Sequence, residues 1–150
     1  MTQKDKELLL KDLCARLPYR VKVLNSTFKD EVIQTLLGRI SENEFNMVEA
    51  YKQVGGEDYG TVKDDIHYTA RIDYIKPFLR PMSSMTEEEN HTYWCMNANP
   101  GTGVDYIVFA PELIDWLNAH HFDYRGLIEK GLAIEVTEEN NPYKRYESAR

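Results

Sequence analysis

The apolar positions of residues 3–17 recur at helical spacing and predict the first element of the fold. Together they form one stripe along a helix, which should dock on a hydrophobic core. The stripe consists of Leu9, Leu10, Leu13, Cys14 and Leu17. The polar residues expected to face solvent include Lys4, Lys11 and Asp12. Pro18 cannot continue a helix and should end this one.

Between residues 20 and 80 the pattern changes to short runs with alternating apolar residues, which are typical of strands. The runs are "YRVKVLN", "EVIQTLLGRI", "FNMVEAY" and "TARIDYIKPFL". The second run could also be helical, but we favour a strand with a bulge or bend at Gly38. Pro77 should break the last run, and the glycine-rich residues 52–69 should contain a long mobile loop.

Short strands joined by tight turns favour an α+β fold built on a small antiparallel sheet. We expect either an SH3-like β-barrel or a curled sheet, flanked by an N-terminal helix and a C-terminal helical part. Residues 1–136 are predicted to form this single α+β domain, and residues 137–150 a polar, flexible tail.

The last third of the chain contains further elements. The run "VDYIVFA", residues 104–110, is apolar on both sides and predicts a central strand. Pro111 should then open a helix at its first position. Asp123 is expected to cap another helix that ends at Gly131, by accepting from the amides of Arg125 or Gly126. The following residues, "LAIEV", predict a closing strand.

The composition includes 42% hydrophobic and 29% charged residues, and the net charge of −7 makes the protein acidic. Residues 81–136 hold nine carboxylates against two cations, Arg125 and Lys130. Such a field repels phosphate backbones, so we expect no autonomous binding to nucleic acid, whereas a basic partner would suit it. No apolar run approaches the about 20 residues that span a bilayer, and the N-terminus lacks a secretory signal pattern. We therefore expect no membrane association and a cytoplasmic location.

Part of this acidity has a structural explanation. Thr86 and Glu89 have the spacing of a capping box that opens a helix. Glu87 and Glu88 would lie at the positive end of the same helix, where carboxylates are favoured.

The cluster with the most chemical potential is His120, His121 and Asp123. Neighbouring side chains on a helix diverge by about 100°, so one metal ion rarely binds both histidines. His67 and His91 are isolated in the sequence, and we predict no metal site and no cofactor. Histidines at a helix end would carry a positive charge favourably. We therefore expect structural roles for them, with ligand binding or a hydrolase using His120 or His121 as alternatives.

Aromatic and sulfur side chains offer the other candidates. Cys14 and Cys95 are expected to be small buried hydrophobes. Tyrosines in loops could stack on a ligand base, with Lys63 or Arg71 meeting its phosphate. Among the ten tyrosines, those expected to be exposed are first Tyr59 and Tyr68, then Tyr143 and Tyr146 in the tail.

Three blocks of the chain resemble a recurrent group of small uncharacterised proteins of Bacteroides and related gut bacteria, often encoded in phages, prophages and other mobile elements. The blocks are "LLLKDLCARLPYRVKV", "IDYIKPFLRPMSSMTEEE" and "WLNAHHFDYRGLIEKGLAIEV". The resemblance implies a host range and a phage setting, and it implies no activity, cofactor or site residue.

These observations favour a non-catalytic binding protein, a phage or mobile-element accessory factor whose acidic surface meets a host or phage protein. The alternative is a protein that binds or sequesters a nucleotide signal in phage–host conflict, through Tyr59, Tyr68, Lys63 and Arg71. An enzyme is the third hypothesis and not the one we predict.

Overall fold

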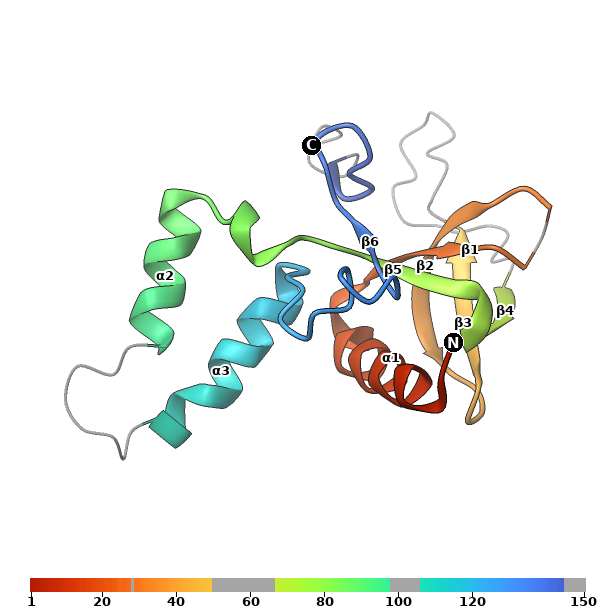
Figure 1. The fold of residues 1–150 in the computed structure, drawn as a ribbon, viewed down its shortest axis with the longest axis horizontal. Coiled ribbons are helices and arrows are strands. Elements are labelled where there is room, and N and C mark those ends of the chain that lie inside the picture. The colour runs from red at the N-terminus through yellow and green to blue at the C-terminus, as the bar shows by residue number, and fades with distance from the viewer. Residues whose placement is uncertain (28, 50–66, 98–105, 145–150) are drawn as a thin grey trace, which may run out of the picture.

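The computed structural model describes residues 1–27, 29–49, 67–97 and 106–144, and it shows an α+β protein (Figure 1). The helices are α1 (Gln3–Arg16), α2 (Glu87–Asn97) and α3 (Tyr106–Ala119), with short 3-10 turns η1 (Leu17–Tyr19), η2 (Ile72–Tyr74) and η3 (Met82–Ser84). The strands are β1 (Lys22–Asn25), β2 (Val32–Arg39), β3 (Glu44–Glu49), β4 (His67–Arg71), β5 (Ile75–Leu79) and β6 (Ile134–Glu135).

The strands form one open sheet in the order β4-β3-β2-β1-β5-β6. Every pairing is antiparallel except that of β5 with β6, which is parallel. In the part of the chain that the structure describes, β4 and β6 lie at the two edges and do not pair with each other. The expectation of an α+β fold is therefore confirmed, whereas the sheet is not closed into a barrel of SH3-like type.

Local strand features were predicted with mixed success. The bulge at Gly38 is confirmed, because the register of β2 with β3 shifts between Leu36 and Gly38. The run expected as one strand over residues 69–79 is instead two strands, β4 and β5, separated by the turn η2. Pro77 does not break β5, since it lies opposite Val23 of β1 and the strand continues to Leu79.

The last third of the chain departs most from expectation. Residues 106–110 belong to helix α3, and Pro111 lies inside that helix and not at its first position. An all-apolar run does not by itself distinguish a buried strand from a helix, and here it is continuous with the helical residues that follow it.

The helix expected after Asp123 is replaced by a series of turns. The carboxylate of Asp123 accepts from the amides of Leu127 and Ile128, each at 2.9 Å, which lie further along the chain than a helix cap reaches. Gly131 ends these turns with a φ of +71°, and the predicted closing strand is reduced to β6.

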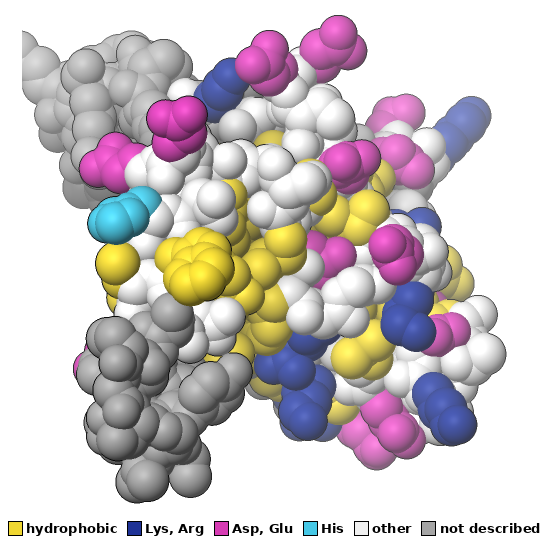
Figure 2. Space-filling model, turned by 60° about the vertical axis from the view of Figure 1, so that its left-hand side comes forward, with side chains coloured by type: hydrophobic (Ala, Val, Ile, Leu, Met, Phe, Trp, Pro, Cys, Tyr) yellow, Lys and Arg dark blue, Asp and Glu magenta, His cyan; other side chains and the backbone are white. Residues whose placement is uncertain are grey.

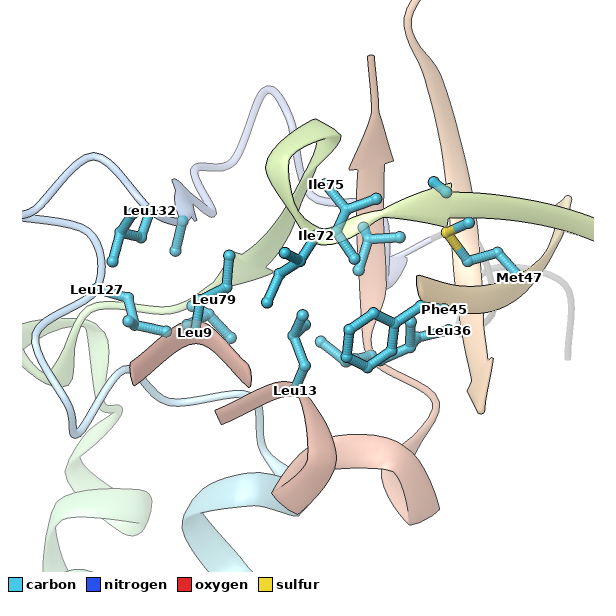
Figure 3. Packing of buried hydrophobic residues seen from close by; sticks show 14 residues of the cluster. Leu9, Leu13, Leu36, Phe45, Met47, Ile72, Ile75, Leu79, Leu127 and Leu132 are labelled. Atoms are coloured by element: carbon cyan, nitrogen blue, oxygen red, sulfur yellow. The ribbon is translucent and has the colours of Figure 1, made fainter. Parts of the chain in front are cut away.

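Helix α1 supplies one side of the core. Thr2 and Asp5 form a capping box at its start, and the helix ends within a residue of the predicted position. Leu9 and Leu13 of its stripe are fully buried against one face of the sheet (Figure 3). The other buried members of this core are Val21, Val23, Leu36, Phe45, Met47, Ala70, Ile72, Ile75, Leu79, Leu127, Leu132 and Ala133.

Candidate functional site

The residues predicted to bind a nucleotide are not brought together in the described part of the chain. Tyr59 and Lys63 lie outside the described residues. Tyr68 and Arg71 both lie on β4, but three residues apart in a strand, so their side chains point to opposite sides of the sheet. His120 and His121 lie near the other end of the strand order, where the backbone of Arg80, just after β5, bonds to His121. The nucleotide site stays a prediction, because two of its four residues are not described and the other two point to opposite sides of the sheet.

The two histidines follow α3 directly, at a helix end as the sequence predicts. Nδ1 of His120 donates to the carbonyl oxygen of Trp116 at 2.9 Å, and its ring lies 4.6 Å from that of Trp116. His121 adopts a left-handed backbone conformation, with φ at +62°, and its ring stacks on Tyr143 at 3.8 Å. Among the described residues, neither ring bonds to a carboxylate, hydroxyl or thiol, so the arrangement offers no activated nucleophile.

His121 is neutral and not the cation expected at a helix end. Burial lowers its pKa to about 3, and the positive charge of Arg16 acts in the same direction. Its Nδ1 is buried and has no hydrogen-bond partner. The ring therefore serves as a packing surface for Tyr143.

Tyr143, which was expected to be exposed on a free tail, is packed against the sheet. Its hydroxyl donates to the carbonyl oxygen of Phe78 at 2.8 Å and accepts from the backbone amide of Lys22 at 3.1 Å. Because Val23 lies opposite Pro77, the next pair in that register would be Lys22 and Phe78. The hydroxyl thus bridges β1 and β5 at the position where the pairing of the two strands ends. Burial raises the pKa of this Tyr143 hydroxyl.

Replacing Tyr143 with phenylalanine is expected to lower the free energy of unfolding by about 1–3 kcal/mol, because two backbone groups lose their partner while the ring stays. Urea denaturation followed by circular dichroism measures the change. The matched control is Tyr74→Phe, since Tyr74 is 46% exposed; it should stay within about 0.5 kcal/mol of the parent. Equal effects of the two changes would contradict a bridging role for the Tyr143 hydroxyl.

A second cluster joins α1 to the turn after α3. Asp12, expected to face solvent, is fully buried. Arg16 is also fully buried. Its guanidinium donates to the Asp12 carboxylate at 2.8 and 3.1 Å and to the carbonyl oxygen of Phe122 at 2.6 Å. Arg125 lies 3.3 Å from the same carboxylate, and both arginines stack near the Tyr124 ring. Burial raises the pKa of Asp12 against the effect of its arginines. We interpret this closed cluster as structural.

The exposed candidate site lies on helices α2 and α3, which together we call the arm. The two helices contact each other and lie beside the sheet and not over it (Figure 1). No residue of α2 is buried, and Trp94 is 65% exposed. Cys95, expected to be buried, is exposed as well. On α3 the side chain of Ile114 is also exposed.

Helix α2 has two distinct faces. Its partly buried residues recur at helical spacing and form the inner face: Glu89, Thr92, Tyr93 and Met96. The exposed residues form what we call the outer face: Glu87, Glu88, Asn90, His91, Trp94, Cys95 and Asn97. Figure 2 turns the side of the arm forward and shows a gathering of hydrophobic side chains, with carboxylates above it and Lys or Arg side chains below it.

The start of α2 is anchored by the capping box that the sequence predicts. The amide of Glu89 donates to the Thr86 hydroxyl oxygen at 3.1 Å, and the amide of Thr86 donates to the Glu89 carboxylate at 3.0 Å. Arg80 adds two hydrogen bonds to that carboxylate, at 2.7 and 2.8 Å. These contacts fix the base of α2, whose outer-face residues are all exposed.

The arm is acidic throughout, because the sequence contains no Lys or Arg between Arg80 and Arg125. Its described carboxylates include the exposed Glu87, Glu88, Glu112 and Asp115. This charge was predicted from the sequence, whereas the exposure of Trp94 was not. A helical run shows which residues share a face, and not which face a neighbouring element covers.

No helix in the described residues is long and apolar enough to cross a membrane. Within the same residues, no set of three or more His, Cys, Asp or Glu side chains is arranged to hold a metal ion. Comparison with protein-family models, with curated proteins and with solved structures gave no match.

Proposed function

We propose that this protein acts by binding a partner protein, and not by catalysis, and that the outer face of α2 binds a basic, amphipathic segment of that partner. The observation that carries the proposal is Trp94, a large aromatic side chain 65% exposed on a helix without a single buried residue. Tryptophan is among the residues that contribute most to the binding energy of protein interfaces.

Charge selects the kind of partner. Glu87 and Glu88 lie on the same face as Trp94, and no cation of the arm neutralises them. A field of one sign speeds the encounter with a partner of opposite sign and disfavours partners of like charge. A segment that carries Lys or Arg beside an apolar residue fits this face, whereas nucleic acid does not. A cytoplasmic location and a phage or mobile-element setting remain predictions of the sequence.

Selection from a library of random peptides displayed on a surface tests this proposal. We expect the enriched peptides to combine Lys or Arg with an aromatic or aliphatic residue. Trp94→Ala should weaken binding of such a peptide by about tenfold or more, which corresponds to at least about 1.4 kcal/mol. The double variant Glu87→Gln, Glu88→Gln should weaken it less and reduce its dependence on salt concentration.

The matched control is Tyr74→Ala, which removes an exposed aromatic side chain from η2, outside the arm. It should leave the affinity unchanged. Enriched peptides without a basic bias, or peptides that bind equally well to Trp94→Ala, would overturn the proposal.

A further inference from the structure

The outer face of α2 also carries His91 and Cys95, whose side chains are of types that bind metal ions. His91 had been considered isolated and Cys95 buried, but both are exposed and lie one helical turn apart. The Sγ atom of Cys95 is 3.7 Å from Nε2 of His91. Ligands four residues apart on a helix face the same way and can chelate one ion.

The distance between the two atoms fits a tetrahedral zinc ion. Zinc binds thiolate sulfur at about 2.3 Å and imidazole nitrogen at about 2.0–2.1 Å, with an angle near 109° between two ligands. Two such bonds place the sulfur and the nitrogen about 3.6 Å apart. The pair therefore stands close to the separation required, and the side chains need little rearrangement to bind.

One chain supplies only half of such a site, since structural zinc sites have four protein ligands and no third ligand group is arranged here among the described residues. We propose that His91 and Cys95 bind a zinc ion together with the same pair of a second copy, in a Cys2His2 site on a twofold axis. A twofold axis brings identical surfaces together, so one pair per chain supplies all four ligands.

Charge makes this association depend on the metal. Glu87 and Glu88 lie on the same face as the pair, so two copies repel each other without an ion between them. Binding converts each thiol to a thiolate and releases its proton to solvent, and the two thiolates then match the charge of one Zn²⁺. We therefore expect a monomer without zinc and a dimer with it. The inference goes beyond the binding role proposed above and does not rest on it.

Titration of the full chain with Co²⁺ under a phosphine reductant tests the inference, because tetrahedral cobalt–thiolate sites give strong visible and near-ultraviolet absorption. We expect this absorption to saturate at one ion per two chains, to disappear when Zn²⁺ is added, and to coincide with dimer formation in sedimentation velocity. Cys95→Ser and His91→Gln should each lower the affinity at least tenfold. Both residues are exposed, and far-ultraviolet circular dichroism checks that each variant folds.

The matched control is Cys14→Ser, which removes the other cysteine, on α1, and should leave the titration unchanged. A thiol–imidazole hydrogen bond without metal affinity predicts no cobalt–thiolate absorption, and that result would overturn the inference. Saturation at one ion per monomeric chain, or undiminished binding by Cys95→Ser, would overturn it too.

Discussion

Replacing Arg16 with methionine is expected to lower the free energy of unfolding by about 3–5 kcal/mol. The Asp12 carboxylate would keep its fully buried position but lose two of its hydrogen bonds. Arg125, at 3.3 Å and partly exposed, is left as its nearest cation and cannot replace the lost geometry. The carbonyl oxygen of Phe122 loses its donor as well. Urea denaturation at pH 7 measures the loss.

A double variant separates the charge of this cluster from its packing. Asp12→Leu with Arg16→Met replaces both charges by apolar side chains, so no unpaired charge is buried, and it should recover most of the stability that Arg16→Met loses. The exposed Lys11→Met on the same helix should stay within about 0.5 kcal/mol of the parent. If Arg16→Met costs less than about 1 kcal/mol, the ion pair does not hold α1 to the turn after α3.

The same cluster shows what the sequence could and could not predict. The leucine stripe of α1 and the capping box of α2 depend on residues three or four positions apart, and both were predicted correctly. The capping box of α1, formed by Thr2 and Asp5, has the same spacing but was not predicted. Asp12 was placed on the surface because it is charged, although Arg16 stands one turn away as a partner. Burial of the pair depends on Phe122, which is 106 residues further along the chain, and no local pattern contains that contact.

The outer face of α2 was not predicted as the candidate site, for a related reason. Histidines next to an aspartate drew attention because of their chemistry, yet the structure uses His121 as a packing surface for Tyr143. Cys95 was predicted to be buried because large apolar residues surround it in the sequence, and the exposure of Trp94 was not predicted. Their exposure follows from the position of α2 beside the sheet, which only the tertiary arrangement determines.

The ion pair between Arg80 and Glu89, which fixes the base of α2, should make the free energy of unfolding depend on pH. Two hydrogen bonds from Arg80 lower the pKa of Glu89 to about 2, although partial burial opposes them. A carboxyl whose pKa is lower in the folded state adds stability above its unfolded pKa of about 4.5 and loses it as the pH falls toward 2. Glu89→Gln should therefore cost about 2–3 kcal/mol at pH 7.

The pH dependence distinguishes this ion pair from packing. Glutamine has nearly the shape of glutamate and can still accept from the Thr86 amide, so the variant removes mainly the charge. The difference between parent and Glu89→Gln should shrink steadily from pH 5 to about pH 2, measured by urea denaturation across that range. Glu88→Gln, at an exposed position of the same turn, should show a small difference at every pH. A loss for Glu89→Gln that is equal at pH 7 and near pH 2 would mean that α2 is anchored by shape and by its capping box, and not by the charge of Arg80.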